Sequence, residues 1–100
     1  MKFCNAMIGA DPLDWCRLAQ VAEEVGFSAA AVSDHVVYPS FLGSRYPYTP
    51  DGSPQFSPDE HWPDVWVSIA AMAAVTTTLR FMTNIYVLPL RNPFVVAKAV

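Results

Sequence analysis

Apolar and polar positions in the first quarter of the chain follow the periods of a strand and then a helix. Residues 2–8 form a short, mostly apolar segment that predicts a strand. Asp11 and Pro12 have the residue types of a helix cap and of a first helical position. The apolar residues that follow recur at helical spacing: Trp15, Leu18, Ala19, Ala22 and Val25. The pattern therefore predicts a strand followed by an amphipathic helix.

A second strand and a long irregular segment come next. Gly26 is predicted to end the helix. Residues 27–33 are small or apolar without polar alternation, which is typical of a strand buried on both faces. Residues 38–62 break the periodicity, because six of the nine prolines lie between Pro39 and Pro63, interleaved with glycines, serines and aromatic residues. Loops beyond about 15 residues in compact domains are usually functional, so we expect an ordered loop or lid.

The last third of the chain repeats the alternation of helix and strand. Pro63 and Asp64 are predicted to open a second helix, which is rich in alanine. Its apolar residues repeat three and four residues apart, and the helix is expected to pack closely on a sheet: Trp66, Ile69, Ala70, Ala73 and Ala74. Residues 80–88 predict a third strand, and Asn92 with Pro93 predicts the start of a third helix.

Strands that alternate with helices and are this apolar predict an α/β fold with a parallel sheet. The turn after the first predicted strand has one glycine and no GxGxxG pattern, so an open dinucleotide-binding sheet loses its main support. A complete (β/α)₈ barrel takes about 250 residues, or roughly 30 per unit. We therefore expect residues 1–100 to be the N-terminal portion of a TIM (β/α)₈ barrel, about three β/α units, with the C-terminal remainder of the barrel absent.

Composition and charge narrow the class of protein. A hydrophobic content of 53% excludes a disordered chain, and the net charge of -3 with six scattered basic residues favours neither nucleic acid nor an anionic membrane surface as partner. The longest apolar run, residues 65–75, is shorter than the roughly 20 residues of a membrane span, so we expect a cytoplasmic protein. Cys4 and Cys16 have no metal-binding spacing, and we interpret them as reduced packing residues.

Candidate chemistry lies at the carboxyl ends of the predicted strands, where α/β folds bind their ligands. Asp34 and His35 follow the second strand, and an imidazole is well suited to proton transfer near neutral pH. Adjacent side chains on an extended segment point to opposite faces, so the two residues are expected to have different roles. The alternative is structural: Asp34 caps a loop turn, and His35 is a half-buried histidine with its hydrogen bonds satisfied.

Other residues support weaker hypotheses. Asp34, His35 and His61 are the only plausible ligand set for a metal, and we favour no metal site. Arg91 has the chemistry to bind a phosphate or carboxylate, although an arginine at a strand end is more often the structural partner of an acid. Four aromatic residues either line a pocket or pack the loop: Tyr46, Tyr48, Trp62 and Trp66.

Four motifs in order give the chain a resemblance to a known family. They are residues 31–37 (AVSDHVV), 44–52 (SRYPYTPDG), 70–76 (AAMAAVT) and 87–93 (VLPLRNP). In these motifs the chain resembles the N-terminal part of luciferase-like oxidoreductases, specifically the branch that depends on the deazaflavin coenzyme F420. The resemblance covers essentially the whole chain. It implies a (β/α)₈ barrel that transfers a hydride with a cofactor bound at the C-terminal mouth, the cofactor carrying the chemistry.

The resemblance also implies roles for individual residues. His35 resembles the active-site histidine, the catalytic residue that transfers a proton. Asp34 resembles the acid that contacts the deazaflavin. The third strand of the family carries a non-proline cis peptide against the cofactor ring, which falls here at Asn84 and Ile85, so these two residues are expected to bind the cofactor. The loop 38–62 would cover the site, and its own aromatic residues favour an apolar or flat small-molecule substrate.

Length and cofactor leave alternatives open. Members of the family are nearly three times as long, so we expect completion by the missing barrel segment or by self-association, as a homo-oligomer. FMN with monooxygenase chemistry is the alternative cofactor. A second class of hypothesis is a non-catalytic fragment or accessory chain that acts through assembly.

Overall fold

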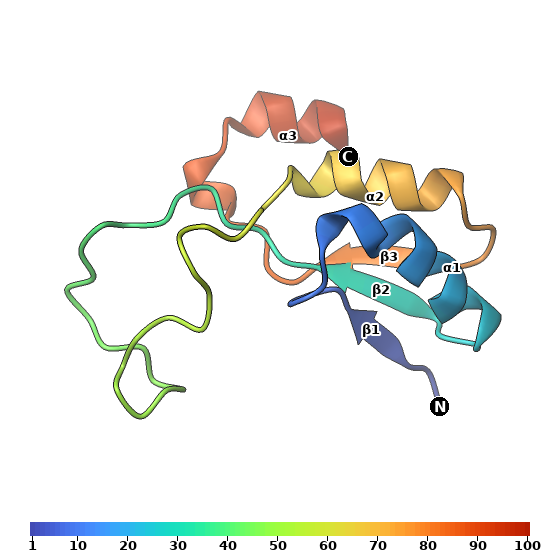
Figure 1. The fold of residues 1–100 in the computed structure, drawn as a ribbon. Helices are drawn as coiled ribbons and strands as arrows, with labels where there is room; N and C mark the ends of the chain where they lie inside the picture. Colours follow the sequence, from blue (N-terminus) through green and yellow to red (C-terminus); the bar gives the residue numbers. More distant parts are fainter.

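Three short parallel strands form the sheet of the computed structural model, which describes residues 1–100 (Figure 1). They are β1 (Cys4–Ala6), β2 (Ala29–Val32) and β3 (Arg80–Thr83), in the order β1-β2-β3. Ala30 is paired with Asn5 on one side and with Phe81 on the other. The predicted α/β fold with a parallel sheet is confirmed.

Two helices cover one face of this sheet and form the core with it. The helices are α1 (Trp15–Glu24) and α2 (Val65–Ala74). The core is a cluster of nine buried residues from both helices, β2 and the adjoining segments: Met7, Trp15, Ala19, Ala22, Ala30, Val32, Val65, Met72 and Leu79. The alanines of β2 and α1 let the helix pack closely on the sheet. The other face of the sheet is open, and Met82 is 51% exposed there.

The helix starts follow the predicted capping residues. Asp11 accepts a hydrogen bond from the Leu13 amide and caps a short 3₁₀ turn, η1 (Pro12–Asp14), which continues into α1. Gly26 ends α1 with a positive φ of 89°, where a side chain would be strained. Asp64 accepts from the Trp66 and Val67 amides at the start of α2.

Three details differ from the predicted elements. The strands are shorter than expected: β3 ends at Thr83 instead of continuing to residue 88, and a second 3₁₀ turn, η2 (Leu88–Leu90), follows with Pro89 inside it. Of the apolar positions predicted for α2, Trp66 and Ile69 pack against the core, whereas Ala70, Ala73 and Ala74 are exposed. The longer side chains of Val65 and Met72 are buried instead, because they remove more apolar area from water.

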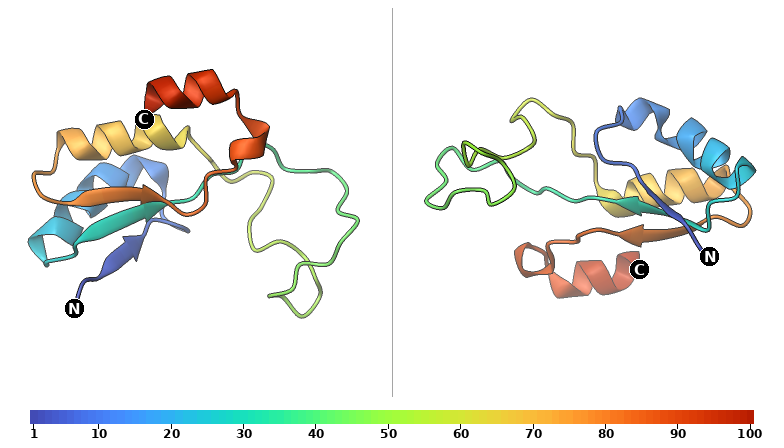
Figure 2. Two further views of the ribbon diagram at one scale, coloured as in Figure 1. Left: turned by 180° about the vertical axis from the view of Figure 1, so that it is seen from behind. Right: turned by 90° about the horizontal axis from the view of Figure 1, so that it is seen from below.

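The third helix, α3 (Pro93–Ala99), begins as predicted at Asn92, which accepts hydrogen bonds from the Phe94 and Val95 amides. No residue of α3 is buried, and Phe94 is 85% exposed. In Figures 1 and 2, α2 lies between α1 and α3. No helix is long and apolar enough to cross a bilayer.

The segment between β2 and α2 has no helix or strand, as predicted for residues 38–62, and extends beyond the carboxyl ends of the strands (Figure 1). Its tip is held by internal hydrogen bonds, from the Tyr46 amide to the Gly52 carbonyl and from the Arg45 guanidinium to the Pro50 carbonyl. Nearer the sheet, four aromatic rings pack in a cluster: His35, Tyr38, Phe56 and Trp62. The loop is therefore organised by its own contacts.

At the opposite end of the sheet, the carboxylate of Glu23 ties α1 to the turn that leads into β3. It accepts hydrogen bonds from the amides of Thr77, Thr78 and Leu79, and from the Thr78 hydroxyl at 3.0 Å. These donors, chiefly the Thr78 amide, lower the pKa of Glu23 from 4.5 to about 2.

We predict that Glu23→Gln lowers the stability of the protein at neutral pH. A depressed folded-state pKa contributes stability that is present above pH 4.5 and is lost as the pH falls towards 2. The stability difference between wild type and variant, measured by chemical denaturation, should therefore be largest at pH 7 and shrink below pH 4.5. Glu24→Gln is the matched control, because Glu24 is exposed and pairs only with Arg17 at 3.5 Å. A pH-independent difference for Glu23→Gln would contradict the assignment.

Candidate functional site

Three connecting segments meet where the parallel strands end. Residues 7–12 follow β1, residues 33–35 follow β2 and residues 84–91 follow β3. Carboxyl ends of parallel strands share one edge of a sheet, which is the position of ligand sites in α/β folds. All four predicted site residues lie at this edge: Asp34, His35, Asn84 and Ile85.

Asp34 is the only buried polar or charged residue, with its side chain 2% exposed. Its Oδ1 accepts a hydrogen bond from Nη2 of Arg91 at 2.5 Å, and its Oδ2 accepts from the Val87 amide at 3.3 Å. A buried carboxylate needs such partners, because an unpaired buried charge is strongly unfavourable. Asp34 thus joins the end of β2 to the segment that follows β3.

Arg91 is the structural partner of an acid, which was the favoured sequence interpretation. Besides Asp34, its guanidinium lies 3.8 Å from the carboxylate of Asp64 and 5.2 Å from the centre of the Tyr86 ring. The Tyr86 ring also packs against Trp66, with their centres 5.5 Å apart. Of the two interpretations of Trp66 that the sequence left open, the structure therefore shows packing against the protein.

The Asn84–Ile85 peptide bond is cis, at the position that the family resemblance implied. The amide of Asn84 donates to the Val32 carbonyl at 2.8 Å, and its carbonyl accepts from the Ser33 hydroxyl at 2.9 Å. The Ile85 side chain is 74% exposed. The two residues therefore present an apolar side chain and an amide on the surface beside the end of β2.

His35 packs in the aromatic cluster of the loop. The centre of its ring is 4.0 Å from that of Phe56 and 4.4 Å from that of Trp62. It lines a cavity of about 230 Å³ together with Tyr38 and Trp62. Asp34 is bonded to Arg91, whereas His35 contacts the loop. The two adjacent side chains therefore have separate partners, as expected for side chains that point to opposite faces of an extended segment.

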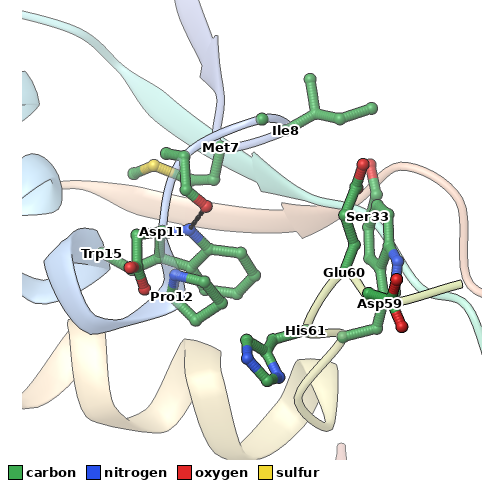
Figure 3. Close-up of a pocket in the computed structure, with 12 residues that line it drawn as sticks. Met7, Ile8, Asp11, Pro12, Trp15, Ser33, Asp59, Glu60 and His61 are labelled. Atoms are coloured by element: carbon green, nitrogen blue, oxygen red, sulfur yellow. Dashed lines mark hydrogen bonds between the residues drawn. The ribbon is translucent and has the colours of Figure 1, made fainter. Parts of the chain in front are cut away.

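A second cavity, of about 380 Å³, opens between the segment after β1 and the end of the loop (Figure 3). Its walls carry three carboxylates and one imidazole, from Asp11, Asp59, Glu60 and His61, and the indoles of Trp15 and Trp62. The Trp15 indole is fixed by a hydrogen bond to the Ala10 carbonyl at 3.1 Å. Trp62 and Glu60 line both this cavity and the one beside His35, so the two cavities are neighbours.

Most of this cavity could not be identified from the sequence. The carboxyl ends of the strands were expected to carry the chemistry, and residues 7–10 lie at the end of β1. Nothing in the pattern of residues 59–61 indicates that the loop returns to β1. No three His, Cys, Asp or Glu side chains are grouped in a way that could hold a metal ion. In the loop, Tyr46 lines a third cavity with His35, whereas Tyr48 is 77% exposed.

Comparison with known proteins identifies the family of this chain. A model of the luciferase-like monooxygenase family matches residues 7–100. Uncharacterized proteins of Mycobacterium tuberculosis and Mycobacterium bovis are each 40% identical to the chain over 98 residues, which cover 98% of the chain and 34% of the relatives. The chain thus spans about a third of the length of these curated relatives, and no solved structure matches it. With the parallel sheet and the site at its carboxyl edge, these matches show that the chain belongs to the luciferase-like monooxygenase family.

Proposed function

We propose that the protein is a luciferase-like oxidoreductase that transfers a hydride between coenzyme F420 and a small-molecule substrate. In this proposal residues 1–100 are the first three units of a (β/α)₈ barrel, and the cofactor lies at the carboxyl ends of the strands. The family match and the sequential parallel order of the strands support it. The exposed face of the sheet, with Met82 on it, would be the barrel interior, closed by the rest of a longer protein or by a second copy in a homo-oligomer.

The observation that carries the proposal is the surface made by Asn84 and Ile85. An apolar side chain that is 74% exposed, next to a free amide, suits the flat face and the polar edge of a deazaflavin ring. When bound, the deazaflavin accepts or donates a hydride. Asn84 and Ile85 would then orient the ring at the edge of the sheet beside Ser33, whose hydroxyl holds the Asn84 carbonyl.

The residues around this edge of the sheet do not fit the phosphate-bearing tail of such a cofactor, because they offer it no free basic side chain. Of the arginines near this edge, Arg91 is bound to Asp34, and Arg45 donates to the Pro50 carbonyl in the loop. The cavity of Figure 3 is lined by carboxylates and by no lysine or arginine. We therefore propose that residues outside this chain hold the tail.

His35 is proposed as the catalytic residue that transfers a proton to or from the substrate. Its ring lines a cavity at the carboxyl end of β2, and the aromatic rings of Phe56 and Trp62 exclude water on one side. Asp34 is included in the proposed cofactor site, because its carboxylate accepts a hydrogen bond from Val87, in the segment that follows Asn84 and Ile85. A largely aromatic and apolar loop beside His35 favours a substrate with a flat or apolar part.

A second candidate is FMN with monooxygenase chemistry, and the description of the matching family favours it. The two candidates use similar flat rings and the same edge of the sheet. They differ in the reaction of the reduced cofactor with oxygen, which the flavin supports and the hydride-transfer reaction does not require.

We predict that the complete protein binds F420 more tightly than FMN. The measurement is a fluorescence titration of the full-length protein with each cofactor in turn, followed by oxygen uptake with the reduced form. Saturable F420 binding without rapid oxygen uptake is the expected result. Tighter binding of FMN together with oxygen uptake would contradict F420 as the cofactor and support the second candidate. Binding of neither cofactor would contradict the proposed function.

We also predict that His35→Phe lowers turnover by a factor of about 100 or more, since general acid–base catalysis contributes roughly 10²–10⁴-fold. Phenylalanine retains the packing against Phe56 and Trp62, so cofactor affinity and melting temperature should change little. His35→Ala, which also removes the packing, should lose the same turnover but with a lower melting temperature. Wild-type turnover by His35→Phe would exclude His35 from proton transfer and leave it as a packing residue.

A further inference from the structure

The pair formed by Asp34 and Arg91 is the most heavily buried charged contact in the chain, and it adjoins the proposed cofactor surface. Side-chain exposure is 2% for Asp34 and 22% for Arg91. Apart from the contacts of Arg91 with Asp34 and Asp64, the chain has one ion pair, between Arg17 and Glu24. Their side chains are 66% and 63% exposed. Removing one partner of a buried pair leaves an uncompensated charge away from water. The geometry around Asp34 therefore depends on Arg91, whereas the geometry around an exposed acid does not depend on its ion-pair partner in this way.

Asp34 is poorly placed to contact a ligand. One carboxylate oxygen accepts from Arg91 and the other from the Val87 amide, both within the protein. Nearly all of its side chain is covered. A residue acting on the cofactor from this position would have to act through the groups that it holds.

The groups held by this pair belong to the segment that carries Asn84 and Ile85. Val87 follows Ile85 by two residues and is fixed to Asp34 through its amide. Tyr86, between them, lies under the guanidinium of Arg91. The other end of the segment is fixed by the hydrogen bonds of Asn84 to Val32 and Ser33. Asn84 and Ile85 are therefore exposed but held on both sides.

We propose that Asp34 and Arg91 are positioning residues that hold residues 84–87 as the wall against which the cofactor ring lies. This inference rests on the proposed function and changes the role expected of Asp34 from direct contact with the cofactor to support of the wall. Arg91 extends the support to α2, because its second Nη atom lies 3.8 Å from the Asp64 carboxylate that caps that helix. A displacement of the wall by about 1 Å is enough to lower a rate roughly 100-fold.

The first test needs no ligand. Amide hydrogen exchange is measured in the full-length protein for the wild type, Asp34→Asn, Arg91→Gln and Arg91→Lys. The Val87 amide and its neighbours should exchange at least about tenfold faster in Asp34→Asn and Arg91→Gln, because opening of the segment no longer breaks a charged contact. Arg17→Gln is the matched control and should leave exchange of residues 84–87 unchanged. Unchanged exchange in both pair variants would overturn the proposal.

The second test is a double-mutant cycle on cofactor binding, with F420 and FMN as probes. Asp34→Asn, Arg91→Gln and the double variant should each weaken binding of the cofactor that the wild type prefers by a similar factor of about ten, since each change breaks the same contact between Asp34 and Arg91. The double variant has no uncompensated buried charge, so its fold is retained if a single variant is unstable. Arg91→Lys keeps the charge but not the planar fork, and should fall between wild type and Arg91→Gln.

The outcomes separate the alternatives. If Asp34→Asn weakens cofactor binding and Arg91→Gln does not, Asp34 contacts the cofactor directly and the positioning role is wrong. Additive effects of the two single variants would also overturn it. A wild-type protein that binds neither F420 nor FMN removes the proposed function, and hydrogen exchange alone then decides whether the pair positions residues 84–87.

Discussion

The burial of one carboxylate, that of Asp34, constrains the arrangement of the carboxyl edge of the sheet. A charge in that position needs donors, and the chain supplies them from the Val87 amide and from Arg91, more than fifty residues away in sequence. Satisfying Asp34 therefore fixes the path of the chain after β3, and with it the exposed surface of Asn84 and Ile85. Arg91 connects this arrangement to the start of α2 through Asp64.

A second carboxylate, that of Glu23, accepts hydrogen bonds from backbone amides at the other end of β3. Glu23, on α1, binds the amides of residues 77–79 just before β3 begins, and Asp34, after β2, binds an amide just after β3 has ended. The strand at the edge of the sheet is thus held at both ends by acids from earlier elements. In both places backbone amides donate to charged acceptors, which form stronger hydrogen bonds than neutral ones.

Much of the fold follows from local sequence rules. Asp11 and Asn92 cap the segments that they were predicted to cap, α2 starts at Asp64 close to its predicted opening, and Gly26 ends α1, because these signals act within a few residues. In α2, Trp66 and Ile69 pack against the core, but the alanines of the predicted set are exposed. An alanine-rich helix has several apolar faces, and packing buried Val65 and Met72 in place of these alanines. At the site, the end of a predicted strand located Asp34 and His35, and the family resemblance implied Asn84 and Ile85. The partners of these residues came from distant segments.

The sequence by itself determined the alternation of strands and helices, their caps, the irregular segment 38–62 and the family resemblance, because each depends on residue types at short spacing. Only the tertiary structure decided that Asp34 is satisfied by Arg91, that His35 packs on Phe56 and Trp62, and that residues 59–62 return to the end of β1 to form a cavity. These contacts join residues separated by some twenty to fifty-seven positions. Their selection depends on which buried groups find partners in the folded chain, and spacing along the sequence does not encode it.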